Sequence, residues 1–177
     1  LGDVNGDGQL DLETADFGSD SVSILPGTDT GSFGAKTDFG TGGDPISVAI
    51  GDFNGDGQLD LTSTNLNSDT VSILLNNASF APSGVFCPKS DFGTGTTPVS
   101  VAAGDFNSDG RLDLAVANNS PNSTVSILLG AGTGSFGAKT DFATGASPRS
   151  VVVGDFNGDG KADILWWNSN TGQVFQQ

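Results

Sequence analysis

The sequence predicts an all-β fold built from repeated four-stranded antiparallel sheets, and two observations lead to this prediction. One nine-residue loop pattern, D-x-N-x-D-G-x-x-D, occurs four times, and its first residue is Asp3, Asp52, Asp105 and Asp155, so the copies are 49, 53 and 50 residues apart. Each interval also holds the same series of short apolar segments separated by turn residues. Repeats of about this length are typical of propellers and other repeat arrays.

The segment before each complete loop is a short apolar strand that begins at a proline. These predicted first strands are residues 45–50, 98–103 and 148–153. They consist mainly of small and β-branched residues, a composition that predicts a strand buried on both faces.

Three further strands are predicted in each repeat. The second strand begins at the end of the loop, at Leu10, Leu59, Leu112 and Ala162. The third strand alternates as hairpin strands do and covers residues 22–25, 71–75, 125–129 and 173–175. The fourth and most polar strand lies around residues 38–39, 91–92 and 141–142. Four antiparallel strands, with the buried strand first and the polar strand last, describe the blade of a β-propeller.

The whole chain, residues 1–177, is therefore expected to form one β-propeller-type repeat array of four-stranded antiparallel blades. The approximate repeats are residues 1–44, 45–97, 98–147 and 148–177, which is about three and a half to four blades. The first repeat begins at the tail of a first strand and the last stops after a third strand. We therefore expect a piece of a longer chain, an array closed by a second copy, or an unusually small array. Open strand edges at the two ends would favour self-association into a ring or a filament.

Phe residues that follow Gly-rich turns are expected to fill the gaps between adjacent blades. They occur in the segments 32–35 and 135–138, both Ser-Phe-Gly-Ala. The second repeat has an enlarged stretch, residues 76–89, in which Phe80-Ala81-Pro82 is expected to replace the Phe-Gly segment. This stretch also holds Cys87, the single cysteine, so the sequence contains no disulfide framework and no zinc or redox spacing. Cys87 is expected to act as a small apolar residue.

The four loops predict four calcium sites, because calcium takes about six to eight oxygen ligands and alternating carboxylate and amide side chains supply them. The predicted ligands are the side chains at loop positions 1, 3, 5 and 9 and the main-chain carbonyl at position 7. They are Asp3, Asn5, Asp7, Gln9, Asp11, Asp52, Asn54, Asp56, Gln58, Asp60, Asp105, Asn107, Asp109, Arg111, Asp113, Asp155, Asn157, Asp159, Lys161 and Asp163. Arg and Lys at position 7 must point to solvent while their carbonyls turn inward. Gly at position 6 permits the positive φ that the bend requires.

Two other interpretations of the loops are less consistent with the sequence. Asn, Asp and Gly also form turns without metal, but a turn does not require three Asp and one Asn at fixed odd positions four times. An EF-hand loop begins in the same way but ends in Glu at position 12 between helices. Here position 12 is Thr14, Ser63, Val116 and Trp166, and the residues after each loop alternate like a strand.

The loops and the Phe-Gly-Ala segments resemble the FG-GAP or VCBS repeats of integrin α-chain propellers and of many bacterial secreted proteins. The resemblance covers essentially the whole chain. It implies that each loop joins the first and second strands of a blade and binds calcium at the matching positions.

Charge restricts the partners that this protein can have. The net charge is −15, and twelve of the twenty Asp residues lie in the four loops. Six Lys and Arg residues are spread along the chain and form no basic patch for nucleic acid or for an anionic membrane surface. No apolar run is long enough for a membrane span. Because such loops work at millimolar calcium, the expected location is extracellular or at the cell surface.

Three classes of function compete. The sequence favours a non-catalytic calcium-binding module for adhesion or for binding an extracellular protein or carbohydrate. The alternative is a structural subunit of a surface filament or ring assembled end to end. An enzyme is the least favoured, because the chain has no His and no Tyr and its Cys has no base available. A carboxylate pair of a carbohydrate-active enzyme is the catalytic alternative, but Asp38, Asp91 and Asp141 recur at equivalent places and fit a structural role.

Two further sets of residues stand out. N-glycosylation acceptor sequences occur at Asn77, Asn118 and Asn122, which would place sugar on one rim if the source glycosylates its proteins. Trp166 and Trp167 replace small residues of the other repeats and are expected to pack in the core and against a neighbouring blade.

Overall fold

The computed structural model describes residues 1–76, 85–120, 123–168 and 174–176, and within them it shows four antiparallel sheets and no helix. The first sheet contains β1 (Leu12–Asp16), β2 (Ser21–Leu25) and β3 (Thr37–Gly40). The second contains β4 (Pro45–Gly51), β5 (Asp60–Asn65), β6 (Thr70–Leu74) and β7 (Ser90–Gly93). The third contains β8 (Pro98–Gly104), β9 (Asp113–Asn118), β10 (Thr124–Leu128) and β11 (Thr140–Ala143), and the fourth contains β12 (Pro148–Gly154), β13 (Asp163–Asn168) and β14 (Val174–Gln176).

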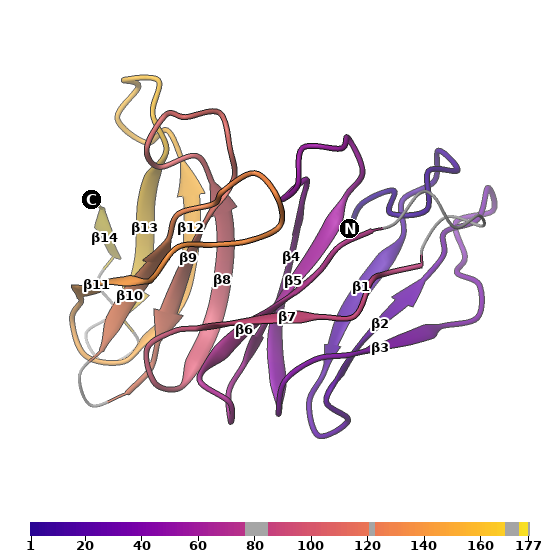
Figure 1. Ribbon diagram of the computed structural model, residues 1–177, viewed down its shortest axis with the longest axis horizontal. Helices are drawn as coiled ribbons and strands as arrows, with labels where there is room; N and C mark the ends of the chain where they lie inside the picture. The colour runs from indigo at the N-terminus through magenta and orange to yellow at the C-terminus, as the bar shows by residue number, and fades with distance from the viewer. Residues whose placement is uncertain (77–84, 121–122, 169–173, 177) are drawn as a thin grey trace.

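The four sheets lie side by side in chain order along the long axis of the molecule (Figure 1). Within each sheet the strands follow one another as antiparallel neighbours, with no crossover. The predicted all-β array of propeller-type blades is confirmed, and the predicted strand positions are correct to within a few residues. Most second strands begin one residue later than expected, at Asp60, Asp113 and Asp163.

Each first strand starts with a register shift at its proline. The pairing shifts between Pro45 and Ser47, and the same shift occurs in β8 and in β12. Proline has no N–H to donate to the ladder, so it is tolerated at the first residue of a strand or at a bulge. The proline thereby marks where each new blade begins.

The expectation that the first strands are buried on both faces was wrong. Most residues of β4, β8 and β12 are half-buried or exposed, whereas every residue of β5 and β9 is buried. The first strands lie at a sheet edge, and β8 packs beside β4 and β12. In contrast, β5 and β9 lie inside their sheets and are covered on both faces, which explains the difference.

Phe side chains close the gaps between adjacent sheets, as predicted for Phe136, whereas the prediction was wrong for Phe33, which is 47% exposed because no described sheet precedes its own. Phe86 packs edge-on against Phe39 of the first sheet, with ring centroids 5.1 Å apart. Phe136 packs between Phe53 and Phe92 of the second sheet, at 5.9 and 5.4 Å. Each ring belongs to the segment that leads into the fourth strand of its sheet, β7 for Phe86 and β11 for Phe136. From there it packs against the preceding sheet in the chain.

The assignment of Phe80 to this role was wrong, because Phe86 occupies the equivalent position. Phe86 forms an isolated bridge with Asn76, as Phe33 does with Gly27 and Phe136 with Gly130. Phe80 itself lies outside the described residues. The sequence Phe86-Cys87-Pro88-Lys89 before Ser90-Asp91-Phe92 parallels Phe136-Gly137-Ala138-Lys139 before Thr140-Asp141-Phe142, and this spacing could have identified it.

Polar contacts tie the turn that leaves each of the first two sheets to the sheet that follows it. Gly95 N–H donates to Ser126 Oγ across the gap between the second and third sheets, at 3.0 Å. Asn118 Nδ2 donates to the same hydroxyl at 2.8 Å. A Cβ on Gly95 would lie 2.6 Å from the Asn118 side chain, so only glycine permits this approach. Gly42, Ser72 and Asn65 repeat the arrangement one blade earlier.

Within the described part of the chain, no helix has the length and apolar content that a membrane crossing would need.

Candidate metal-binding loops

Three of the four loops connect a first strand to a second strand, and these three lie along one rim of the array (Figure 1). They join β4 to β5, β8 to β9 and β12 to β13, and the loop of residues 3–11 precedes β1. The expected positive φ at position 6 is present in every copy, at 86° for Gly8, 83° for Gly57, 81° for Gly110 and 83° for Gly160. The bend that would wrap the loop around an ion is therefore part of the backbone conformation.

The Asp at position 1 turns inward and accepts hydrogen bonds from the loop main chain. Asp52 Oδ1 accepts from Gly55 N–H at 2.7 Å and from Asp56 N–H at 3.2 Å, and its Oδ2 accepts from Gly57 N–H at 2.8 Å. Asp3 and Asp155 make the same three contacts. In the third loop, main-chain donors that include Gly110 N–H lower the pKa of Asp105. One carboxylate thus fixes the curvature of the whole loop.

Positions 3 and 5 repeat this inward orientation on a smaller scale. Asn54 Oδ1 accepts from Asp56 N–H at 2.9 Å, and Asp56 Oδ1 accepts from Gln58 N–H at 2.8 Å. Equivalent pairs occur in the other loops. Such side-chain-to-backbone bonds two residues ahead are typical of Asn and Asp in turns. They place alternate side-chain oxygens on the inner side of the loop.

The side chains of positions 3, 5 and 9 converge in the first and fourth loops. Asn5 Nδ2 lies 3.0 Å from Asp7 Oδ2 and 3.4 Å from Asp11 Oδ1. Asn157 Nδ2 lies 3.4 Å from Asp159 Oδ2 and 3.2 Å from Asp163 Oδ1. In the second and third loops the amide donates to the position-5 carboxylate at 3.1 Å. In these two loops the Asn amide group thus lies between the two carboxylates that would bind a cation.

The Asp at position 9 has a structural role that the sequence analysis did not identify. Asp60 is fully buried; its Oδ2 accepts from Phe53 N–H at 2.9 Å and its Oδ1 from Asn76 N–H at 2.7 Å. It therefore ties the start of the loop to the residue that follows the third strand. Equivalent bonds tie Asp11 to Gly27 and Asp113 to Gly130. The nearly constant spacing of about 16 residues between each Asp and the residue whose N–H group donates to it was the signal available in the sequence.

Burial makes an ionised Asp60 costly. The pKa of Asp60 is raised to about 6, mainly by desolvation and also by the negative charges of Asp56 and Asp52, although the hydrogen bonds from the main-chain N–H groups of Asn76 and Phe53 act to lower it. A carboxylate in this setting would be stabilised by a positive charge placed close to it.

The side chains of Arg111 and Lys161 at position 7 and the residues at position 12 lie where the sequence analysis expected, whereas the inward turn of the position-7 carbonyl stays a prediction. The side chains of Arg111 and Lys161 are exposed, so they leave the interior of the loop open to oxygen ligands. The residues at position 12 lie in β1, β5, β9 and β13, in strands and not in helices. The EF-hand interpretation is thereby excluded for these loops.

The loop oxygens fit a hard cation in chemistry, although their present contacts are made to the protein itself. In residues 1–76, 85–120, 123–168 and 174–176, no three His, Cys, Asp or Glu groups are arranged as a ready-made ion site. The carboxylates instead accept main-chain N–H groups. Because each such oxygen has a second lone pair, an inward-facing oxygen can keep its N–H partner and still be available to a cation.

The recurring Asp residues of the fourth strands are held in structural networks. Asp141 Oδ1 accepts from Ser126 Oγ at 2.6 Å, and its other oxygen pairs with Lys139. Asp38 and Asp91 make the same contacts with Ser23 and Lys36 and with Ser72 and Lys89. Hydrogen bonds from Lys36 and Ser23 lower the pKa of Asp38, which keeps it ionised. Three equivalent pairs of this kind support a blade-building role.

The remaining sequence candidates have different outcomes. Asn118 is 0% exposed and donates to Thr124 and Ser126, so the folded protein does not present it for glycosylation. Asn77 and Asn122 lie outside the described residues. Trp166 is buried as expected, but Trp167 is 44% exposed and its predicted burial was wrong, because neighbouring side chains on a strand face opposite ways.

Comparison with known proteins identifies the repeat and the fold. The model of a family described as FG-GAP-like repeat matches residues 3–63, 59–116 and 105–166. No curated protein matches the sequence significantly. A chain in the crystal structure of BBS1N in complex with ARL6DN, soaked with lead, superposes with a TM-score of 0.66 at 16% identity. The match covers 98% of this chain and 50% of that one.

A second similar structure is a chain of the Photorhabdus luminescens Tc holotoxin pore. It has a TM-score of 0.53 and 16% identity, and the match covers 94% of this chain and 8% of that one. The present chain thus spans half or less of the structures that it resembles. At this identity the likeness concerns the fold alone.

Proposed function

We propose that this chain, which belongs to the FG-GAP-like repeat family, is a non-catalytic calcium-binding module that serves adhesion or ligand binding outside the cell. The observation that carries the proposal is the inward orientation of the oxygens at positions 1, 3 and 5 in loops that recur in every repeat. In the second loop these are the side chains of Asp52, Asn54 and Asp56. Carboxylate and amide oxygens are the ligands that calcium prefers.

Calcium would supply positive charge and no redox or acid–base chemistry. In each loop it would be held by the side chains at positions 1, 3, 5 and 9 and by the position-7 carbonyl. Four divalent ions would reduce the net charge from −15 to about −7, which relieves repulsion along the rim. The module would then be rigid at the millimolar calcium concentrations found outside cells, which is the basis for proposing an extracellular or cell-surface location.

A non-catalytic role is supported by the contacts of the acidic side chains. The Asp residues of the loops accept main-chain N–H groups, and those of the fourth strands pair with Lys and Ser. The same contacts recur in successive blades, so the equivalent Asp residues have similar surroundings. A catalytic acid and base instead need two neighbouring carboxyl groups whose surroundings give them different pKa values. A protein or carbohydrate ligand is the proposed partner, as is usual for a rigid repeat surface.

The number of bound ions tests the calcium proposal directly. Calorimetric titration of the metal-free chain with calcium is expected to give four ions per chain with dissociation constants below about 1 mM. A chain carrying Asp7→Ala, Asp56→Ala, Asp109→Ala and Asp159→Ala is the matched control and should bind none. Absence of binding by the unaltered chain at several millimolar calcium would refute the proposal.

Replacement of single loop residues should separate ion ligands from structural clamps. Asp60→Ala removes the acceptor of two buried N–H groups and should cost about 2–4 kcal/mol of unfolding free energy even in chelator, with a further loss in calcium because Asp60 is also a proposed ligand. Asp56 is exposed, so Asp56→Ala should cost less than about 1 kcal/mol in chelator and more in calcium. Asp29→Ala, at an exposed residue outside the loops, is the control. Denaturant titrations of the three variants under both conditions measure these differences, and a calcium-independent effect of Asp56→Ala would contradict the assignment.

A further inference from the structure

The peptide group at position 2 of the first loop is held from both sides. Val4 N–H donates to Asp11 Oδ2 of its own loop at 3.0 Å, and Val4 O accepts from Asn76 Nδ2 of the second blade at 2.7 Å. Both Val4 and Asn76 are buried, so water does not compete for these bonds. Position 2 lies between two proposed ligands, Asp3 and Asn5. A bond to its peptide group therefore acts directly on the loop.

Asn76 also holds the second loop. Its main-chain N–H donates to Asp60 Oδ1 at 2.7 Å, and Asp60 Oδ2 accepts from Phe53 N–H at 2.9 Å. Phe53 is the position-2 residue of the second loop, as Val4 is of the first. A series of buried hydrogen bonds thus connects the two loops through Asp60 and Asn76.

A similar link joins the second and third loops through main-chain groups. Phe53 O accepts from Gly134 N–H at 2.9 Å. Gly134 follows Gly130, whose N–H donates to Asp113 Oδ1 at 2.8 Å, and Asp113 Oδ2 accepts from Phe106 N–H at 2.9 Å. In both cases the position-2 carbonyl receives its donor from the segment that follows the third strand of the next blade.

The two links are built from different sequences. Asn76 stands where the first and third blades have Gly27 and Gly130. In the third blade Gly132 and Gly134, with φ of 71° and 73°, turn the chain so that a main-chain N–H reaches the preceding loop. In the second blade the side-chain amide of Asn76 makes the equivalent contact. Two local solutions to one contact indicate that the contact itself matters to the array.

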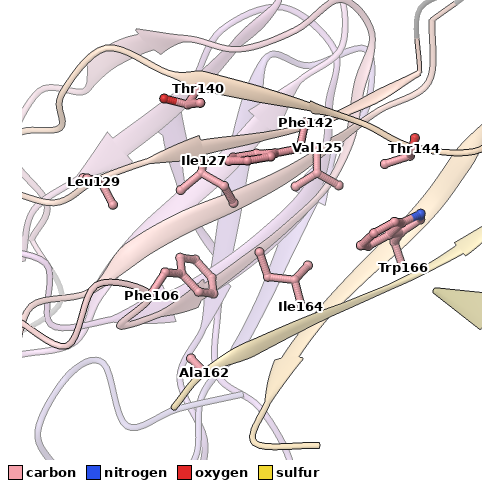
Figure 2. A pocket seen from close by; sticks show the side chains of 10 residues that line it. All are labelled: Phe106, Val125, Ile127, Leu129, Thr140, Phe142, Thr144, Ala162, Ile164 and Trp166. Atoms are coloured by element: carbon pink, nitrogen blue, oxygen red, sulfur yellow. The ribbon is translucent and has the colours of Figure 1, made fainter. Parts of the chain in front are cut away.

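The side chains at position 2 are packed most tightly in the first two loops. Val4 and Phe53 belong to buried core clusters. Phe106 instead lines a cavity of about 340 Å³ together with Ile127 and Ile164 (Figure 2). Close packing limits how far the peptide group can move, so the first and second loops are the pair in which a link should act most strongly.

We propose that the first and second loops bind calcium cooperatively, with Asn76 as the positioning residue that connects them, an inference that rests on the calcium sites of the proposed function. An ion held by Asp52 and Asn54 would fix the peptide group of Phe53 between them. Through Asp60 it would also fix Asn76, and with it the peptide group of Val4.

The physical basis is an ordering cost that is met only once. Groups that the first ion has ordered need not be ordered again by the second, which gives positive cooperativity without a change of fold. Coupling between two sites is reciprocal and typically amounts to about 5–150-fold in affinity. For one hydrogen-bonded link we expect about fivefold, at the lower end of this range.

Chains with one or two intact loops measure the coupling. Asp109→Ala and Asp159→Ala together leave the first two sites, and a further Asp56→Ala or Asp7→Ala leaves only one of them. In calorimetric titrations with calcium, the overall affinity of the two-site chain should exceed the product of the two one-site affinities by about fivefold. Two ions bound with affinities that simply multiply would overturn the coupling and leave the calcium proposal intact.

Asn76→Gly in the same set of chains tests the positioning role. It keeps the main-chain N–H that donates to Asp60 and installs the residue of the first and third blades. It removes only the side-chain amide, which donates to Val4 O and to Leu59 O. The two-site chain should still bind two ions, but the fivefold excess should disappear. An excess that persists would overturn the role of Asn76.

Ser68→Ala is the matched control. Its hydroxyl accepts from Gly43 N–H at 2.8 Å, which ties the connection between the first and second blades to the turn after β5, at the end of that strand away from the loop. The variant loses a contact between the same blades but none of the link, so the fivefold excess should remain. Loss of the excess in Ser68→Ala as well as in Asn76→Gly would indicate general loosening of the blades and would overturn a specific link.

Amide hydrogen exchange in chelator tests the link without calcium. Asp60→Ala releases Asn76 N–H and should therefore speed exchange of Val4 N–H, in the other loop, by about fivefold, as expected for the loss of one hydrogen bond. Phe156 N–H, which makes the equivalent bond to Asp163 in the fourth loop, is the internal reference for global loosening. Equal acceleration at Val4 and Phe156, or none at Val4, would overturn the link whether or not calcium binds. If Asp60→Ala does not fold in chelator, the calorimetric comparison, which leaves Asp60 unchanged, still decides.

Discussion

Chelation of calcium is expected to lower the free energy of unfolding by about 6 kcal/mol at 25 °C. If each of the four loops binds with a dissociation constant of about 0.1 mM, then about 1 mM calcium stabilises the folded chain by roughly 1.4 kcal/mol per loop. Domains of this kind have a total stability of about 5–15 kcal/mol. For a chain of 177 residues the melting temperature should fall by roughly 10–20 °C.

Scanning calorimetry in 1 mM calcium and in excess chelator measures this loss. The quadruple variant carries Asp7→Ala, Asp56→Ala, Asp109→Ala and Asp159→Ala. It should melt at the same temperature in both conditions, near the melting temperature of the unaltered chain in chelator. Magnesium should replace calcium poorly, because its smaller ion demands a stricter octahedral geometry. An unaltered chain that melts identically in calcium and in chelator would contradict the proposal.

The fold was predictable because each local signal agreed with the others. Three signals recur in successive blades: proline at the start of the first strand, alternation of the kind seen in Val71 to Leu74, and Gly at loop position 6. Local preferences that agree with one another in this way identify a fold reliably. Burial was not predictable from composition. The runs at β4, β8 and β12 are as apolar as a central strand, yet they lie at sheet edges, and their position depends on packing between blades that periodicity does not encode.

The candidate loops were predictable in position but only partly in role. The spacing of Asp52, Asn54 and Asp56 indicated inward-facing oxygens, which the structure contains. The clamp formed by Asp60 was not predicted, because its second partner, Asn76, is 16 residues away and becomes adjacent only through a hairpin.

Phe136→Ala is expected to cost about 3 kcal/mol of unfolding free energy, whereas Phe33→Ala should cost less than about 0.5 kcal/mol. Both residues stand in identical eight-residue segments, so local propensity and sequence context are the same. Their surroundings differ: Phe136 packs edge-on against Phe53 and Phe92, whereas Phe33 is 47% exposed. Truncation of a buried Phe typically costs about 3–5 kcal/mol, and the partial burial of Phe136 places it at the lower end.

Urea unfolding of the two variants, in calcium and under identical conditions, measures the difference. Phe86→Ala should resemble Phe136→Ala, because Phe86 is buried against Phe39 in the preceding gap. Equal costs for Phe33 and Phe136 would mean that the ring acts within its own blade, for instance through its bridge to Gly27 or Gly130. A large difference would instead establish that the ring stabilises the contact between neighbouring blades, because Phe136 packs against Phe53 and Phe92 of the preceding repeat.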